Sequence, residues 1–138
     1  MGKEYAPIVI TFRYKEANEA IDWLSRAFGF TIKVVHSEED GSVANAQLVL
    51  NNSMIMLASE RDNEFDRFVK HPQELDGYNT ISPYIIVEDI ETHYKTAVKN
   101  GAEILLPLTM QDYGGGGYTC KDIEGYLWNF GSYDPWKE

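Results

Sequence analysis

The chain has 138 residues and a formal net charge of −10, with 22 acidic and 12 basic side chains. Hydrophobic residues make up 43% of it and aromatic residues 13%, a composition typical of one globular domain and not of a disordered chain. The acidic balance argues against nucleic-acid binding, which needs lysine and arginine to neutralise phosphates, and no apolar run reaches the roughly 18 residues of a membrane span.

The first half of the chain predicts one helix and four strands. A short apolar run at 8–12 is typical of a buried strand, and the helix predicted over 15–28 has apolar residues three and four positions apart. Gly29 follows the helix as a C-terminal cap. Three further strands are expected at 30–36, 43–50 and 54–58, separated by turns at 38–41 and 51–52.

The second half repeats this order. It predicts a helix over 89–100 that ends at Gly101, much as the first helix ends at Gly29. The expected strands lie at 83–87, 103–106, 118–121 and 126–130. The repeat indicates an α+β domain of two βαβββ modules, and internal repeats of this kind decide the architecture. We place module one at about 5–58, a polar linker with a short helix (63–70) at 59–80, and module two at about 81–133.

Five stretches resemble one known family: EAIDWL (19–24), AFGF (27–30), AQL (46–48), MIML (54–57) and DIEGYLWNFG (122–131). They are similar to the vicinal-oxygen-chelate superfamily, that is, the glyoxalase/bleomycin resistance/dioxygenase proteins. The last stretch resembles the family's closing DPxGxxW strand, with Ile123 in place of the proline. The nearest likeness is to its metal-poor branch of PhnB-like and bleomycin-resistance-like proteins. The resemblance implies that residues 1–138 form a single domain, with a curved mixed sheet around a cleft.

The resemblance also indicates where a divalent metal would be held. The family's ligand positions align near Val9, near Ser82 and at Asn129, and none of these is an imidazole, thiolate or carboxylate. The histidines at 36, 71 and 93 do not fall at those positions. We therefore expect no metal and no cofactor. A metal site shared between subunits, or one that uses an unaligned carboxylate such as Glu103, stays open as an alternative.

The run of glycines at 114–117 does not match a phosphate-binding loop. Such a loop precedes a helix and carries lysine with serine or threonine, whereas a predicted strand follows here. We interpret the run as a wide hairpin connection with a bulge between two strands of module two. The alternative is a mobile lid over the cleft, because glycine permits close backbone approach and positive φ.

Strand alternation assigns side chains to the cleft or to the core. The residues expected to bind a ligand are Thr11, Arg13, Gln47, Met56, Tyr84 and Asn129, with Tyr113 at the mouth beside the glycines. Trp128 and Cys120 are expected in the core. Arg13 is the one fixed positive charge of this set. We expect it to pair with a protein carboxylate, the alternative being an anionic group of a ligand.

These residues predict binding more than catalysis, because they include no nucleophilic triad and no carboxylate dyad. We expect metal-independent binding of a small amphipathic or aromatic molecule, in the manner of bleomycin-resistance proteins. The alternatives are a metal-dependent glyoxalase-type lyase or dioxygenase, and a non-catalytic regulatory domain. The resemblance and the aromatic segment at 132–136 predict a homodimer. A single cysteine and an N-terminus without an apolar segment favour the cytoplasm.

Overall fold

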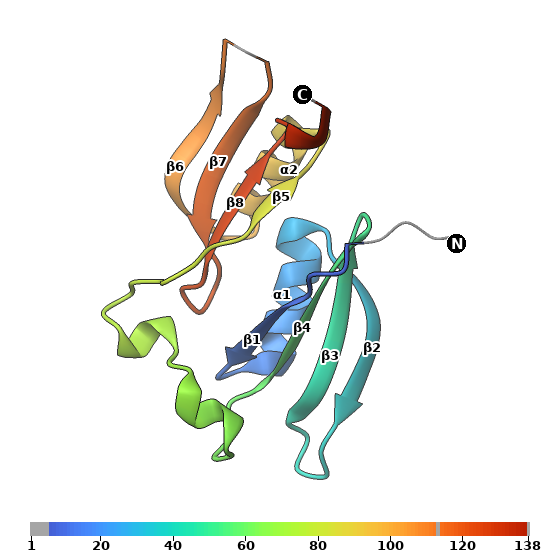
Figure 1. The fold of residues 1–138 in the computed structure, drawn as a ribbon, viewed down its shortest axis with the longest axis vertical. Coiled ribbons are helices and arrows are strands. Elements are labelled where there is room, and N and C mark those ends of the chain that lie inside the picture. Colours follow the sequence, from blue (N-terminus) through green and yellow to red (C-terminus); the bar gives the residue numbers. More distant parts are fainter. Residues whose placement is uncertain (1–5, 113, 138) are drawn as a thin grey trace. The chain divides into compact units, whose positions relative to one another are not determined.

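A computed structural model describes residues 6–112 and 114–137. The chain divides after His71 into two compact units, and each unit holds one α-helix and four strands (Figure 1). Both units therefore show the predicted βαβββ order. No helix in the described residues is long and apolar enough to cross a membrane.

The first unit is a four-stranded sheet with one helix packed on it. Its strands run in the order β1-β4-β3-β2, with β1 parallel to β4 and the other neighbours antiparallel. The helix ends at Gly29, whose φ of 87° requires the left-handed conformation that glycine adopts without strain. The elements are β1 (Ile10–Tyr14), α1 (Ala17–Phe28), β2 (Thr31–Ser37), β3 (Val43–Leu50) and β4 (Ser53–Ser59).

The second unit repeats this topology with the order β5-β8-β7-β6. Its helix begins at a side-chain cap, because the carboxylate of Asp89 accepts a hydrogen bond from the backbone N–H of Thr92. The elements are β5 (Tyr84–Ile86), α2 (Ile90–Lys99), β6 (Glu103–Met110), β7 (Gly116–Lys121) and β8 (Leu127–Gly131). The predicted α+β fold of two βαβββ modules is confirmed.

Several predicted boundaries are wrong, among them the start of β1, the end of β6 and the extent of the linker helix. Strand β1 starts at Ile10 and not at Ile8, which is 78% exposed. Strand β6 continues to Met110 because its pairing with β7 resumes after an irregularity between Leu106 and Thr109, which accommodates a proline that cannot donate to the ladder. The linker helix is shorter than expected and forms a 3₁₀ turn over Phe65–Phe68. Further 3₁₀ turns lie at Pro72–Glu74 and Pro135–Lys137.

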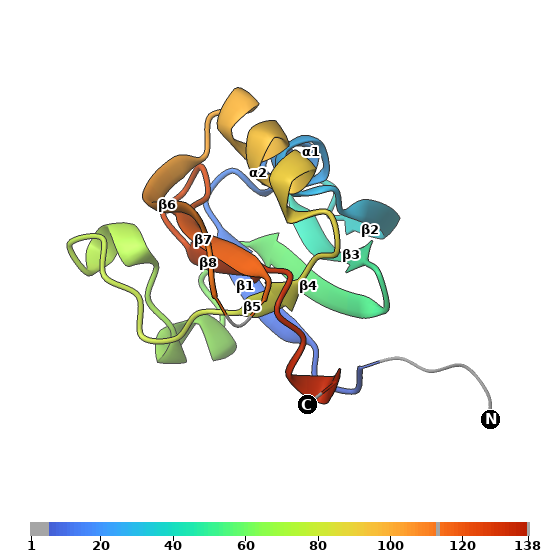
Figure 2. The ribbon, with the colours of Figure 1, turned by 90° about the horizontal axis from the view of Figure 1, so that it is seen from above.

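One face of the second sheet is closed by α2, as Figure 2 shows from above. Tyr118, Cys120, Trp128 and Phe130 point to this side and are almost fully buried. This confirms the predicted core positions of Cys120 and Trp128. Burial raises the pKa of the Cys120 thiol to about 12, so the sulfur stays protonated and is not a nucleophile. The opposite face of the same four strands carries the candidate site.

Candidate functional site

The open face of the second sheet presents two rows of residues that cross all four strands. In the first row the register places Leu106 beside Thr119, Thr119 beside Asn129, and Asn129 beside Tyr84. The second row runs through Thr109, Gly117, Gly131 and Ile86. Because neighbours in a register share one face of a sheet, the alternation puts both rows on the side opposite the core.

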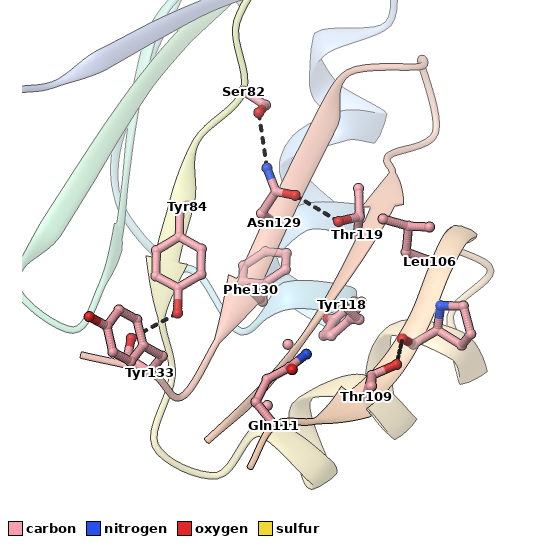
Figure 3. A pocket seen from close by; sticks show the side chains of 13 residues that line it. Ser82, Tyr84, Leu106, Thr109, Gln111, Tyr118, Thr119, Asn129, Phe130 and Tyr133 are labelled. Atoms are coloured by element: carbon pink, nitrogen blue, oxygen red, sulfur yellow. Dashed lines mark hydrogen bonds between the residues drawn. The ribbon is translucent and has the colours of Figure 1, made fainter. Parts of the chain in front are cut away.

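The first row, together with Thr109 and Gly117 of the second, lines a pocket of about 650 Å³ that lies within the second unit. Figure 3 shows Tyr84 and Tyr133 on one side of it and Leu106 and Thr109 on the other. No described lining residue carries a formal charge. A mixed apolar and neutral polar lining of this size is typical of sites for small organic molecules.

The glycine run has two different roles. Gly114 and Gly115 form the β6–β7 turn, with φ values of 99° and 82° that favour glycine. The turn closes through hydrogen bonds between Gln111 and both of these residues. Gly116 and Gly117, however, belong to β7 and line the pocket. The interpretation of all four glycines as a connection is therefore wrong for the last two.

Gly117 leaves the floor of the pocket bare. A Cβ atom at this position would lie 3.0 Å from the carbonyl oxygen of Phe130 on the neighbouring strand, a tight contact that glycine avoids. Gly131, its neighbour on β8, permits the ring of Tyr84 to lie against the backbone, since a Cβ there would be 2.8 Å from the ring. The Tyr84 hydroxyl donates to the carbonyl of Tyr133 at 2.7 Å, which fixes the tyrosine as a wall.

A hydrogen-bonded chain links three strands or their ends at the centre of the first row. The amide nitrogen of Asn129 donates to the Ser82 hydroxyl at 2.9 Å and to the Pro83 carbonyl at 3.1 Å. Its amide oxygen accepts from the Thr119 hydroxyl at 2.7 Å. Because the Pro83 carbonyl can only accept, the orientation of the Asn129 amide is determined by its surroundings. Figure 3 shows this chain from Ser82 to Thr119.

The donor chemistry at this place does not fit a divalent metal. Ser82 and Asn129 lie at two of the positions that align with the metal ligands of the family, and their side chains are hydrogen-bonded to each other. The groups they offer are neutral oxygens and an amide, whereas zinc and similar ions favour imidazole, thiolate or carboxylate. Among residues 6–112 and 114–137 no group of three or more His, Cys, Asp or Glu side chains lies close enough to hold an ion.

Five of the predicted ligand-binding residues fall into two groups of neighbours, one within each unit. In the first unit Thr11, Met56 and Gln47 occupy one cross-strand row of β1, β4 and β3. This row corresponds in topology to Tyr84, Asn129 and Thr119 of the second unit. Tyr113 lies outside the described residues.

Sequence reasoning did not find the pocket residues Thr109, Thr119 and Gly117. Thr119 could have been found, because it lies opposite Asn129 in the register of a β7–β8 hairpin. Thr109 and Gly117 were missed because β6 was predicted to end at 106 and β7 to begin at 118, so the predicted strands left out the pairing that joins them.

Arg13 is engaged by a carboxylate of its own unit. Its Nε donates to Asp66 Oδ1 at 2.8 Å, and its guanidinium carbon lies 4.8 Å from the centre of the Phe65 ring. The second carboxylate oxygen of Asp66 accepts from the backbone N–H of Arg61. Burial opposes the charge on Asp66, but these hydrogen bonds outweigh it and hold the pKa of the carboxyl below its usual range. The predicted pairing of Arg13 with a protein carboxylate is confirmed.

We expect Arg13→Ala to lower the melting temperature without a selective effect on carboxylate-bearing ligands, because it removes a partner of Asp66. Asp66→Asn is the matched variant for pH dependence. The folded pKa of Asp66 lies below its unfolded value of about 3.9, so its stabilisation is complete above that pH and is lost on further acidification. Thermal unfolding from pH 7 to pH 2.5 should show wild type and Asp66→Asn converging at the acidic end. If Arg13→Ala abolished binding of a carboxylate ligand and spared its neutral analogue, Arg13 would instead be a ligand anchor.

Three solved structures illustrate the likeness to known proteins. TioX from Micromonospora sp. ML1 is 26% identical, with a TM-score of 0.71 over 94% of this chain and 98% of that chain. The PhnB protein from Bacillus cereus is 20% identical, with a TM-score of 0.64 over 91% of this chain and 98% of that one. A mutant of the fosfomycin resistance protein FosX from Listeria monocytogenes is 14% identical, with a TM-score of 0.63 over 94% and 93%. The last two show a shared fold alone.

Sequence comparison gives the family directly. No curated protein shows a significant match to the chain. The profile of the glyoxalase/bleomycin resistance protein/dioxygenase superfamily, in contrast, matches residues 8–130, which is nearly the whole chain. Together with the two βαβββ units, this match shows that the chain belongs to the glyoxalase/bleomycin resistance protein/dioxygenase superfamily.

Proposed function

We propose that the protein binds a small amphipathic or aromatic organic molecule without a metal ion, and that it sequesters this molecule without transforming it. One observation carries the proposal. The pocket of the second unit is uncharged, and Ser82 and Asn129 are bonded to each other where metal ligands would be expected. A lining of this kind recognises shape and hydrogen bonds, not charge.

The pocket also lacks groups for acid, base or nucleophilic catalysis. None of its described lining residues is a histidine, cysteine, lysine or carboxylate. Tyr118 does line the pocket, but its hydroxyl is hydrogen-bonded to His93 of α2 on the opposite side of the sheet. The thiol of Cys120 is buried on that side too, and burial raises the pKa of both groups. Chemistry at neutral pH needs a group poised to exchange a proton, and the pocket offers none.

The second candidate function is a metal-dependent reaction of the kind found in other members of the superfamily. The FosX structure contains Mn(II) and 1S,2S-dihydroxypropylphosphonic acid. An anionic phosphonate and its metal need cationic and carboxylate or imidazole partners. The described pocket supplies neither kind, which favours the first function over this one.

Isothermal titration in EDTA tests the proposal with bleomycin and a panel of planar aromatic amines. We expect one site per chain for at least one compound, which should be recovered chemically unchanged after prolonged incubation. Consumption of the compound would support the enzymatic alternative. Failure of every compound to bind would favour the non-catalytic regulatory domain.

We also propose a cytoplasmic homodimer. Trp136 is 88% exposed in the single chain, and large exposed aromatics are enriched where subunits meet. Twofold symmetric dimers are the commonest closed assemblies. Light scattering at micromolar concentration should give about twice the chain mass of 15.8 kDa. Trp136→Ser should shift this mass toward the monomer. A wild-type mass of one chain at that concentration would rule the dimer out.

A further inference from the structure

We infer that the pocket of the second unit selects flat ligands that present hydrogen-bond donors, such as aryl N–H groups, over ligands that present only acceptors. The inference rests on the proposed function, since it names the chemistry of the molecule that the same pocket would hold. It follows from the direction of the hydrogen bonds that the lining already makes.

Two pocket hydroxyls give their hydrogen atoms to backbone carbonyls. The Tyr84 hydroxyl donates to the oxygen of Tyr133 at 2.7 Å, and the Thr109 hydroxyl donates to the oxygen of Pro107 at 3.1 Å. A carbonyl oxygen has no proton to return, so each hydroxyl must be the donor. Both hydroxyls therefore offer the pocket lone pairs and no hydrogen.

Thr119 is committed in the same way through Asn129. The Asn129 amide nitrogen must face the Pro83 carbonyl, so its amide oxygen faces Thr119 and accepts from the hydroxyl at 2.7 Å. The proton of Thr119 is thereby used, and lone pairs remain. Ser82 and Gln111 keep the capacity to donate, and either can donate to a ligand carbonyl in addition.

These three acceptors surround the bare floor of the pocket. Thr109 lies directly beside Gly117 in the register, Thr119 lies two residues further along β7, and Tyr84 rests against Gly131 on the other side. Figure 3 shows Tyr84, Thr119 and Thr109 around the pocket, so a flat ring placed between them would turn its edge toward these oxygens. Tyr84 and Thr109 are exposed in the free protein. A ligand that covers their oxygens without donating to them takes them out of water unpaired, which costs free energy and disfavours a ligand that has no N–H or O–H.

The charge of the chain also favours ligands that present hydrogen-bond donors. The chain has a net charge of −10, and the basic residues of the second unit, at 95, 99, 121 and 137, do not line the pocket. An anionic ligand would therefore find no counter-charge in the described lining, whereas a ligand with polarised N–H groups is favoured by the acidic surroundings.

Carbazole and dibenzofuran provide the test, because they share one tricyclic shape and differ by an N–H in place of an oxygen. Their affinities for the full chain would be measured by fluorescence and by ¹⁵N chemical-shift titration in EDTA. We expect carbazole to bind more tightly by about 5-fold or more, the effect of one hydrogen bond, and to shift the amides of Gly116, Gly117 and Thr119. Equal affinity, or tighter binding of dibenzofuran, would overturn the donor preference and leave the proposed function standing.

The double variant Tyr84→Phe/Thr109→Val removes two of the three acceptors and keeps the shape of the lining. The carbazole preference should fall toward 1, with dibenzofuran affinity nearly unchanged. Tyr78→Phe is the matched control, since Tyr78 is 76% exposed and does not line the pocket. A preference that survives in the double variant would contradict the assignment. If neither compound shifts the pocket amides, the pocket fails as a site for flat aromatic molecules, and the proposed function fails with it.

Discussion

Replacing Asp122 with alanine should lower the free energy of unfolding by about 3–5 kcal/mol, because it removes several hydrogen bonds from a buried carboxylate at once. Asp122 is only 5% exposed. One of its oxygens accepts from the backbone N–H groups of Glu124 and Tyr126, which shape the β7–β8 turn. The other accepts from the indole N–H of Trp128 at 3.0 Å, and Trp128 is fully buried. The alanine variant would leave that indole without this acceptor.

Two further variants separate these contributions in chemical denaturation. Asp122→Asn keeps one oxygen for the turn but places an NH₂ group against the indole. It should therefore lower the free energy of unfolding, but by less than Asp122→Ala does. The double variant Asp122→Ala/Trp128→Phe should lose less free energy of unfolding than the sum of the two single variants, because no indole N–H then remains without its acceptor. Asp40→Ala is the matched exposed control, because Asp40 bonds to Ser42 in the turn between β2 and β3. If Asp122→Ala were as mild as Asp40→Ala, the carboxylate would not organise the second sheet.

Gly117→Val should weaken binding of a pocket ligand such as carbazole by about 100-fold, the effect of forcing a side chain into occupied space. The valine would stand on the pocket floor, next to Thr109 and Gly131 in the register. Gly117 is not among the positive-φ glycines, so its backbone conformation is open to other residues, but a Cβ there would lie 3.0 Å from the Phe130 carbonyl and the strand must adjust to hold it.

Gly117→Ala provides the graded comparison and should have a smaller effect on affinity. Melting curves are needed beside the titrations to show that both variants fold. A folded Gly117→Val protein that binds with wild-type affinity would show that ligands do not use this floor. The pocket would then have no part in the proposed function.

The fold could be predicted because local signals agreed with the final packing. The helix that ends at Gly29 shows both an apolar stripe and a glycine cap, and β3 occupies the predicted residues. The glycine run was harder, because glycine marks turns and bare strand positions equally well. Pro107 likewise made the end of β6 hard to predict. A proline usually ends a strand, but here an irregular register between Leu106 and Thr109 accommodates the proline and the strand continues.

The site could be predicted only as far as strand alternation reaches. Alternation placed Tyr84 and Asn129 on one face, and the register confirms that they are neighbours. That Asn129 bonds to Ser82 and Thr119 depends on strand ends and pairings that the sequence does not state. Likewise Arg13 was expected to meet a carboxylate, but its partner Asp66 lies 53 positions away in the linker, where no periodicity identifies it.

Metal-independent binding in the pocket is tested most directly by one comparison of affinities. The dissociation constant of carbazole would be measured in EDTA, and again in EDTA-free buffer with one equivalent of Mn(II) or Zn(II). Because the Ser82–Asn129 pair offers no ligand set for such an ion, the two values should agree within about twofold. A gain of about tenfold or more on adding metal, or binding that disappears in EDTA, would contradict a metal-independent site.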